Sequence, residues 1–366
     1  MTYLFYIPQM AAYGGMERHV CLLATLLARQ HHSVTMLTTS NSLNKSARTE
    51  LQCTGVELRE LPVARGTASK ARKLAWLLSN AVRLRARSWD MIYSNGQSAL
   101  ARIAWLARNG RTRIVHHHHT AGDSEEQKTW HPSFRRVLAS APELVACSRS
   151  TKAHLEASLG RDDVVFLPYL TPQILPASAV RENGSAPDAI LHFGFTGRLV
   201  PTKGIDTICE LSRHPDLTGV RWHIHGSGED YPASYFEPFQ NIEYHGAYSG
   251  AADCAQILSH LDAVALFSSH NEGMPLSLIE AMSAGLPWVA ADRGGTRELA
   301  VVPGNCEVIP SGATFDEIKA HTLALAARIR AGQTSRVEQR RAYDEHFAFP
   351  ATSGRWLDFL NAHPSA

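Results

Sequence analysis

The segment 270–287, HNEGMPLSLIEAMSAGLP, places a glycine and two glutamates around a predicted helix start. It follows the strand-like run DAVALF, and Pro275 suits the first turn of a helix. Gly273 lets a ligand approach the backbone closely, because it carries no side chain. The first amides of a helix lack internal partners and, with the helix dipole, favour a pyrophosphate. We therefore predict an anion site at the backbone of Gly273, Met274, Pro275 and Leu276.

Glu272 and Glu280 flank this helix start. Helical side chains lean toward the N-terminus of their helix, so Glu280 can reach back over the helix start. A carboxylate there would repel phosphate but suits paired hydroxyls, such as those of a ribose. Glu272, which precedes the helix, could accept hydrogen bonds from sugar hydroxyls. Taken alone, the pair is also compatible with one solvated and one helix-start glutamate.

A second cluster lies in 194–204, GFTGRLVPTKG, where a strand is expected to end at Gly197. Arg198 and Lys203 follow within a short loop before the next helix. Arginine binds phosphate oxygens bidentately and lysine acts as a point charge, so the two cations could clamp a phosphate. Loop charges are often only solvated, and that interpretation fits Lys203 as well as the clamp does. Arg198 lies against the strand end, which favours a functional role.

Two further strand-like runs end in glycine. Gly226 and Gly228 follow one run in HIHGSGED, and Gly246 follows the next in EYHGAYS. Because carboxyl ends of parallel strands meet at one edge of a sheet, these glycines would line the same edge as Gly197. The first run is not a GxGxxG fingerprint, and each glycine alone could mark an ordinary turn.

The first half of the chain offers a glycine pair and a histidine run. Gly14 and Gly15 stand between a strand and a helix, where backbone can approach a phosphate or sugar, although an ordinary turn is equally compatible. Residues 116–119 are four histidines at a strand end, with alternate side chains on opposite faces. Such neighbours do not easily converge on one metal ion, and no HExxH motif appears. His118 or His119 could instead hydrogen-bond a sugar hydroxyl at the strand end.

The elements that must position these residues follow a repeating strand–helix pattern, which is typical of parallel α/β sheets. Helices are expected between the strands, for example at 16–29, 69–87 and 97–108. Strands are predicted at 2–7, 33–38, 90–93, 113–118, 143–147 and 163–167, and then at 190–196, 220–225, 241–245, 262–267 and 288–291.

The pattern breaks at a proline-rich stretch, which we interpret as a linker over 169–189. We therefore expect an N-terminal α/β domain over 1–168 and a second over 190–349, with a final helix at about 350–366 that packs back on the first. Facing domains of this class form a cleft, which is a favoured place for a small-molecule site. The 366 residues are enough for two cores.

Composition excludes several classes of protein. The net charge of +2 gives no global field for nucleic acid, so we expect no nucleic-acid partner. The six cysteines are scattered without CxxC spacing, which favours reduced thiols in the cytoplasm. The N-terminal sequence MTYLFYIPQM lacks a positive n-region, and no apolar run approaches a membrane span. We therefore expect a cytoplasmic protein.

Together these motifs resemble glycosyltransferase family 4 over residues 2 to about 300. The resemblance rests on Gly14-Gly15-Met16-Glu17, Gly197-Arg198-Leu199, Lys203-Gly204, Gly226-x-Gly228, His245-Gly246 and the spacing of Glu272 and Glu280. It implies a GT-B fold, with two tandem Rossmann-like domains that face a cleft. It also implies a retaining hexosyltransferase that uses a UDP-, GDP- or ADP-sugar. Pro168-Tyr169-Leu170 and Trp288 depart from the family pattern at the linker and after Gly-x-Pro.

The resemblance also implies roles for single residues. Arg198 and Lys203 would hold the diphosphate, Glu280 the ribose, and Glu272 with the amides of residues 273–276 the donor sugar and phosphate. Gly14, Gly15, Gly226 and Gly228 would also contact the donor. The family's strand-end histidine matches His119, with His118 as the alternative. The acceptor would attack from the face that the leaving group departs, and the departing phosphate would take the acceptor's proton. No DxD motif is present to hold a metal, so we predict transfer without metal or cofactor.

Residues 65–87 suggest a membrane contact. They hold seven Lys/Arg residues, and Leu74, Leu77, Leu78 and Val82 recur at helical spacing. Such a helix could lie on anionic lipid beside a lipid-linked acceptor, as in a peripheral membrane protein. It could equally be an ordinary α/β helix docked on its sheet with a basic outer face.

Two alternatives to a transferase remain open. One is a nucleotide-sugar epimerase on the same fold, against which the paired glutamates and the two cations argue. The other is a non-catalytic nucleotide-sugar-binding subunit of a polysaccharide assembly. The sequence leaves the base, the donor sugar and the acceptor open, and analogy with the family favours a glycan or lipid-linked acceptor in bacterial lipopolysaccharide or exopolysaccharide synthesis.

Overall fold

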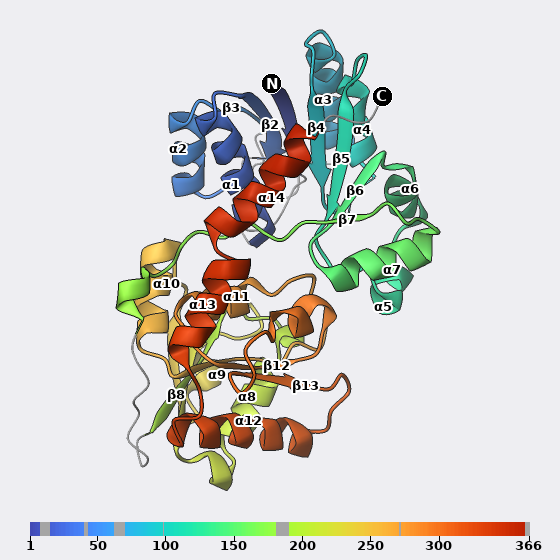
Figure 1. Ribbon diagram of the computed structural model, residues 1–366. Helices are drawn as coiled ribbons and strands as arrows, with labels where there is room; N and C mark the ends of the chain where they lie inside the picture. The colour runs from blue at the N-terminus through green and yellow to red at the C-terminus, as the bar shows by residue number, and fades with distance from the viewer. Residues whose placement is uncertain are drawn as a thin grey trace. The chain divides into compact units, whose positions relative to one another are not determined.

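The structure, a computed structural model, describes residues 1–7, 15–39, 43–61, 70–97, 99–180, 190–270 and 272–362. The chain divides into two compact units. The first unit contains Met1–Thr171 and Thr352–Ala366, and the second contains Pro172–Ala351. Each unit is built on its own parallel sheet with helices packed on it (Figure 1). The predicted α/β class with two tandem parallel sheets is therefore confirmed.

The first unit has a seven-stranded sheet in the order β3-β2-β1-β4-β5-β6-β7, and every pair is parallel. The order reverses between β1 and β4, which are register partners from Tyr3 and Met91 onward. The strands are β1 Thr2–Tyr6, β2 Ser33–Thr39, β3 Glu57–Leu61, β4 Met91–Asn95, β5 Arg113–His118, β6 Glu143–Ala146 and β7 Val165–Phe166.

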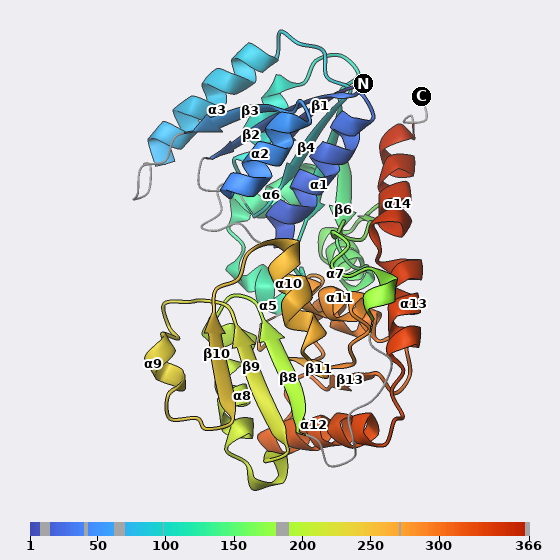
Figure 2. The same ribbon diagram turned by 90° about the vertical axis from the view of Figure 1, so that its left-hand side faces the viewer.

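The second unit has a six-stranded parallel sheet in the order β10-β9-β8-β11-β12-β13. Figure 2 shows β8, β9 and β10 side by side at one edge of this sheet. The strands are β8 Leu191–Thr196, β9 Val220–His225, β10 Ile242–Gly246, β11 Ala263–Leu266, β12 Trp288–Ala291 and β13 Cys306–Ile309.

Helices connect successive strands in both units, as parallel pairing requires. In the first unit and up to its boundary they are α1 Gly15–Arg29, α2 Lys45–Cys53, α3 Lys70–Leu84, α4 Ala101–Ala104, η1 Trp105–Ala107, α5 Ser124–Thr129, α6 Pro132–Ser140 and α7 Arg149–Leu159. The remaining helices are η2 Ala177–Ala179, η3 Pro201–Lys203, α8 Ile205–Ser212, η4 Pro215–Leu217, α9 Ala233–Phe236, α10 Gly250–Ser259, α11 Leu276–Ser283, η5 Gly294–Leu299, α12 Phe315–Arg330, α13 Arg336–His346 and α14 Phe349–Asn361.

Local sequence signals set several helix ends. The Ser148 hydroxyl accepts a hydrogen bond from the Thr151 amide at the start of α7, and Gly160 ends that helix in the left-handed conformation. Thr314 and Glu317 form a capping box at the start of α12. These caps satisfy backbone groups that a helix leaves without internal partners.

Each sheet carries a buried apolar core. Leu4, Phe5 and Ile92 are fully buried in the first unit, as are Phe193 and Val264 in the second. Burying a side chain of this size contributes roughly 1.5–3 kcal/mol. Among the described residues, no helix is both long and apolar enough to cross a membrane.

Two strands were not predicted, and both lie at sheet edges. β3 reads ELREL, and its Glu57 accepts hydrogen bonds from Arg59 and Arg87. β13 reads CEVI, and its Glu307 pairs with Arg328. An edge strand needs less apolar surface than a central one, so paired charges hide the strand signal in the sequence.

The proposed linker over 169–189 contains buried side chains in its described part. Tyr169 and Leu170 belong to the first unit and are 5% and 1% exposed. Ile174 and Leu175 belong to the second unit and are 7% and 8% exposed. Residues 181–189 lie outside the described part of the chain.

The last helix carries residues that pack in the first unit. Trp356 is fully buried, and its indole N–H donates to the Pro168 carbonyl at 2.7 Å. Arg113 of β5 donates to the Leu360 carbonyl at 2.9 Å. These contacts join the C-terminal residues to the sheet of the N-terminal unit.

Candidate functional site

The loop after β8 holds Arg198 at the sheet edge. The Gly197 amide donates to the His225 carbonyl and the Leu199 amide to the Ser227 carbonyl, both at 3.0 Å. The pairing of β8 with β9 therefore continues past the end of both strands. Arg198 lies between these two anchored residues with an exposed side chain. Within the described ranges its guanidinium has no hydrogen-bonded or ionic partner, so it remains available to a ligand.

Gly226 and Gly228 allow this close pairing. A Cβ atom at Gly226 would lie 1.8 Å from the Gly197 carbonyl oxygen, and one at Gly228 would lie 1.7 Å from the Leu199 carbonyl oxygen. Both distances are far shorter than atomic contact allows. The two glycines, predicted to contact the donor, thus have a packing requirement that itself positions the Arg198 loop.

A third glycine brings Lys203 to the end of β11. Gly204 has φ +76°, and a Cβ atom there would lie 2.3 Å from the Phe267 carbonyl oxygen. The Ser269 amide donates to the Thr202 carbonyl at 2.9 Å. Segment η3 therefore lies against the residues that follow β11. Only glycine fits this position without strain, because other residues avoid the left-handed conformation.

Glu272 accepts two charged or polar contacts on one oxygen. Its Oε1 lies 2.5 Å from Lys203 Nζ, and the Ser268 hydroxyl donates to it at 2.6 Å. His270 Nε2 lies 3.7 Å from the same atom. Oε2 forms no hydrogen bond with any residue that the structure describes, so it is left for a ligand.

The ionisation state of Glu272 follows from these contacts. The residue is 8% exposed, and burial alone raises its pKa. The charge of Lys203, the nearby His270 and the hydrogen bonds outweigh burial, so the pKa of Glu272 falls below its ordinary value. Glu272 is therefore an ionised acceptor at neutral pH.

The start of α11 presents free backbone donors. Pro275 is the N-cap residue, one position earlier than the predicted first turn, and the helix begins at Leu276. The amides of Gly273, Met274 and Leu276 donate to no described residue. Unpaired amides at a helix start bind anions. The predicted anion site therefore has the required donors.

Glu280 lies one turn into the same helix and is 3% exposed. Its neighbours from Leu278 to Ser283 are all buried, and the Ser283 hydroxyl donates to its carbonyl at 2.6 Å. A carboxylate buried this deeply is not the solvated glutamate that the sequence also allowed.

In the first unit the structure describes one of the two predicted glycines. Gly15 is the first residue of α1, and Gly14 lies outside the described residues. The structure therefore places a helix start after β1, as predicted, and says nothing of the loop before it.

The four histidines alternate between two faces of the sheet, as predicted. His117 Nδ1 lies 2.7 Å from the Tyr93 hydroxyl, and the ring centroids of His117 and His119 lie 3.9 Å apart. On the other face, the His118 ring lies 5.4 Å from that of Trp130. His118 Nε2 also contacts the Thr120 hydroxyl at 3.0 Å. His118 is thus enclosed by the core.

His119 is held by a residue of the linker segment. The Tyr169 hydroxyl donates to the His119 carbonyl at 3.0 Å and lies 3.0 Å from His119 Nδ1. A hydroxyl has one proton, so this arrangement makes Nδ1–H the donor to Tyr169 and leaves a lone pair on Nε2. His119 Nε2 has no partner in the described structure. It is therefore positioned as a hydrogen-bond acceptor.

Burial keeps these histidines neutral. It lowers the pKa of His116 to about 3 and of His118 to about 4, and it holds the pKa of His119 well below its ordinary value. A neutral imidazole suits hydrogen bonding to a hydroxyl and cannot supply a positive charge to a phosphate.

Several residues of the candidate site were not predicted. Ser268 and His270 contact Glu272, and Tyr169 holds His119. Ser268 and His270 could have been found from their place after the β11 strand run. Tyr169 stands at a departure from the family pattern, and its contact spans 50 residues, so no local signal marks it.

Comparison with known proteins decides the family. A profile described as Glycosyltransferase Family 4 matches residues 13–168, and one described as Glycosyl transferases group 1 matches residues 191–328. The two matches cover most of the chain. This chain is a family 4 glycosyltransferase.

Curated relatives of this glycosyltransferase include two from actinobacterial species. A D-inositol 3-phosphate glycosyltransferase of Gordonia bronchialis is 26% identical over 93% of this chain and 82% of the relative. A GDP-mannose-dependent alpha-mannosyltransferase of Mycolicibacterium smegmatis is 30% identical over 56% of this chain and 47% of the relative.

Solved structures show that the glycosyltransferase has the GT-B fold. Anabaena HepE in complex with UDP-glucose is 18% identical, with a TM-score of 0.73 over 98% of this chain and 99% of HepE. The lipopolysaccharide outer core galactosyltransferase WaaB is 19% identical, with a TM-score of 0.72 over 98% of each chain.

Proposed function

We propose that this family 4 enzyme is a retaining hexosyltransferase. It transfers the sugar of a UDP- or GDP-sugar to a glycan or lipid-linked acceptor, without a metal, in bacterial surface or exported polysaccharide synthesis. The observation that carries the proposal is the grouping of Arg198, the Lys203–Glu272 pair and the free amides at α11 in one unit. A relative named for GDP-mannose and a neighbour bound to UDP-glucose support this donor class.

The diphosphate is the part of the donor that these residues fit best. Breaking its bond to the sugar leaves negative charge on the phosphate, which fixed positive groups stabilise. The exposed guanidinium of Arg198 binds phosphate oxygens bidentately, and the amides of Gly273, Met274 and Leu276 supply aligned donors. Lys203 adds a cation whose position Glu272 fixes.

The carboxylates serve the hydroxyl groups of the donor. Glu272 is ionised, and its Oε2 can accept from a sugar hydroxyl while Oε1 holds Lys203. Glu280 is assigned to the ribose hydroxyls. On the first unit, neutral His119 accepts a hydroxyl hydrogen bond at Nε2. The acceptor then attacks on the face that the phosphate leaves, and the departing phosphate oxygen takes its proton.

Thermal unfolding with nucleotides tests the donor site. We expect UDP or GDP, and neither ADP nor CMP, to raise the melting temperature of the wild type, because a ligand that binds the folded state stabilises it. Arg198→Ala should lose this shift. Arg341→Ala is the matched control, since Arg341 is also exposed in the second unit and forms no hydrogen bond or ion pair with any residue that the structure describes. The donor-site assignment fails if no nucleotide stabilises the wild type, or if both variants respond alike.

The mechanism needs a separate measurement. With the stabilising nucleotide's sugar conjugate, the sugar released by slow donor hydrolysis or transfer should keep its anomeric configuration by NMR. The rate should be unchanged by EDTA. Inversion would refute the retaining mechanism, and loss of the rate in EDTA would refute metal independence.

A further inference from the structure

Three neighbouring strands of the second unit carry histidines on one face. Along β9, Trp222 and Ile224 are buried, whereas His223 and His225 point to the opposite, less buried face. Glu243 of β10 is the register partner of His223. His245 lies at a bulge of β10, where the register shifts between Tyr244 and Gly246, and its ring stacks on that of His223 with centroids 5.3 Å apart. Strand pairing and ring stacking thus bring His223, Glu243 and His245 together.

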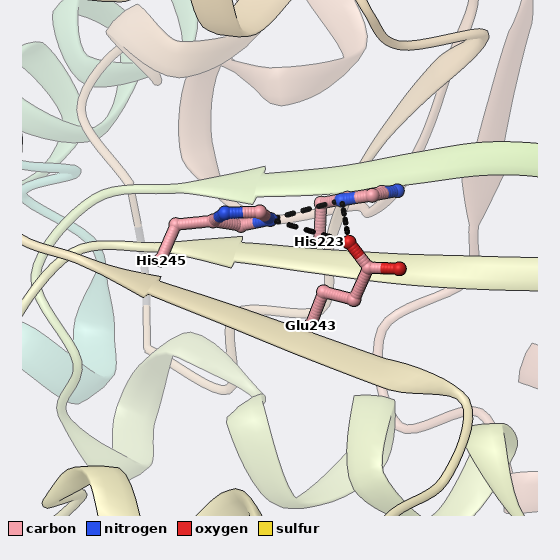
Figure 3. A group of neighbouring side chains, drawn as sticks. All are labelled: His223, Glu243 and His245. Atoms are coloured by element: carbon pink, nitrogen blue, oxygen red, sulfur yellow. Dashed lines mark hydrogen bonds and ion pairs between the residues drawn. The ribbon is translucent and has the colours of Figure 1, made fainter.

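Their ligating atoms converge on one point (Figure 3). His223 Nδ1 lies 3.0 Å from His245 Nε2 and 3.6 Å from Glu243 Oε2. His245 Nε2 lies 4.0 Å from the same Glu243 oxygen. All three atoms lie within 4.8 Å of one another.

These separations match a tetrahedral ion. Zinc binds histidine nitrogen and carboxylate oxygen at roughly 2.0–2.2 Å, so two ligands of a tetrahedron stand about 3.4 Å apart. The three measured separations fall on both sides of this value. The side chains of His223, Glu243 and His245 are 13%, 47% and 38% exposed, which leaves Glu243 and His245 room to turn toward a shared ion.

A fourth histidine sets the tautomer of His223. His192 Nδ1 of β8 lies 2.8 Å from His223 Nε2. When His223 donates Nε2–H to His192, its Nδ1 carries the lone pair that a metal requires. Metal-bound histidines commonly donate their other N–H in this way, which fixes the ring and its tautomer. His192 therefore has the place of an outer partner.

The site opens on a cavity that a fourth ligand can enter. A pocket of about 680 Å³ lies beside the cluster and is lined by the four histidines together with residues of α10. Its lining includes Gly246, Asp253 and His260. A three-residue zinc site with an accessible fourth position is the arrangement of reactive zinc centres rather than closed structural ones.

We propose that His223, Glu243 and His245 bind one zinc ion through Nδ1, a carboxylate oxygen and Nε2, with a water or small anion as the fourth ligand. Two imidazoles and one carboxylate favour zinc over magnesium and calcium, which prefer oxygen ligands. The ion joins β9 to the edge strand β10. It is separate from the group formed by Lys203, Glu272 and the start of α11, and it has no part in the transfer step proposed above.

Without the ion, the same side chains form a hydrogen-bonded chain from His192 through His223 to His245. This alternative needs His245 to donate Nε2–H to His223. It predicts no metal affinity beyond that of scattered surface histidines. The two descriptions are therefore distinguished by stoichiometry and by the variants that abolish binding.

The test uses the full chain without an affinity tag, stripped with EDTA and titrated with ZnSO₄ against a chromophoric chelator. We expect one tight equivalent in the wild type and a loss of more than tenfold in affinity for His223→Ala and His245→Ala. His192→Phe should weaken binding by about 10- to 100-fold, as removal of an outer partner does. His346→Ala is the control, because His346 is 54% exposed in the same unit and, among the described residues, contacts only its chain neighbours Glu345 and Phe347.

Two further measurements distinguish loss of the metal site from misfolding of a variant. Co²⁺ in place of zinc should give the visible absorption of a tetrahedral site in the wild type and not in His245→Ala. All variants should melt like the wild type in EDTA. Zinc should stabilise the wild type and His346→Ala alike, His192→Phe less, and neither His223→Ala nor His245→Ala. The proposal is overturned if the wild type binds no tight equivalent, or if His223→Ala and His245→Ala bind as the wild type does. Nucleotide-induced stabilisation of the zinc-free protein tests the donor site independently.

Discussion

Lys203 and Glu272 are separated by 69 positions in the chain, yet Lys203 Nζ lies 2.5 Å from Glu272 Oε1. The contact depends on Gly204, which lets η3 approach the carbonyl of Phe267. It links the loop after β8 to the segment before α11. The two predicted donor-binding segments are therefore joined by an ion pair, in which each charge holds the other in place before any substrate binds.

The pair should show strong coupling in a double-mutant cycle. The side chains of Lys203 and Glu272 are 17% and 11% exposed, so removing one leaves a poorly solvated charge. We expect Lys203→Met and Glu272→Gln each to lower the free energy of unfolding by about 3 kcal/mol. The double variant should be destabilised by at least about 1 kcal/mol less than the sum of the two single effects. Urea unfolding followed by tryptophan fluorescence measures this.

Acid should weaken the same coupling. The pKa of Glu272 is lower in the folded protein than its ordinary value of 4.5. Its stabilisation is therefore complete above about pH 4.5 and is lost as the pH falls through the folded pKa. Lys319→Met with its exposed partner Asp316→Asn provides a surface-pair control, since Asp316 is 85% exposed. Additive effects of Lys203→Met and Glu272→Gln would contradict the coupling.

The strand–helix pattern predicted most of the fold because central parallel strands must be apolar on both faces. The runs at β8, β11 and β12 carry this signal, and their predicted positions agree with the structure to within one residue. The edge strands β3 and β13 were not predicted because charged residues replace part of the apolar run. Glu57 and Glu307 are paired there with arginines contributed by other segments, Arg87 and Arg328.

The sequence predicted which residues belong to the candidate site, but not which of them contact one another. Glycine and proline marked the ends of elements, so the sequence indicated where Arg198 and Glu272 stand. It did not indicate that Lys203 would bind Glu272 or that Tyr169 would hold His119, because both contacts join segments separated by many residues. Likewise, the packing requirement at Gly228 depends on the approach of Leu199 from the loop after β8.

Mild acid should destabilise the protein through its buried histidines. Burial lowers the pKa of His19 and His116 to about 3, while an unfolded histidine has its ordinary value of 6.5. Their stabilisation is complete above pH 6.5 and falls below it, because only the unfolded chain then takes up protons. Each such histidine should cost about 1.4 kcal/mol per pH unit below 6.5. Urea unfolding at pH 7.5, 6.5 and 5.5 measures this slope.

A substitution assigns the slope to single residues. His116→Asn keeps a partner for the Ser94 hydroxyl, which lies 3.0 Å from His116 Nδ1. It should reduce the pH dependence of the unfolding free energy by the contribution of about one proton. His346→Ala should leave this dependence unchanged, since His346 is 54% exposed. A stability that is constant from pH 7.5 to 5.5, or a wild-type slope in His116→Asn, would show that these histidines are protonated in the folded protein.

Helix α3 has an apolar outer row that suits a membrane surface. Leu77, one of the four apolar residues singled out in the sequence, is buried, whereas Leu74, Leu78 and Val82 are 39%, 39% and 73% exposed. The outer face is therefore not purely basic, which argues against simple docking with a charged exterior. Residues 65–69 lie outside the described structure, and the side chains of Lys70 and Lys73 are not described. Apolar residues next to arginines favour anionic lipid.

We expect Val82→Asp to reduce binding to vesicles that contain anionic lipid, because it places a negative charge in the row that would enter the lipid surface. Val337→Asp is the matched control, since Val337 is 60% exposed in the second unit. Both substitutions are at exposed positions and should leave the melting temperature nearly unchanged. Flotation with anionic and with neutral vesicles separates the outcomes. Equal flotation of the wild type and Val82→Asp on anionic vesicles would remove α3 as the membrane surface. Binding that disappears with Val82→Asp and is absent from neutral vesicles would assign α3 as the surface that contacts anionic lipid.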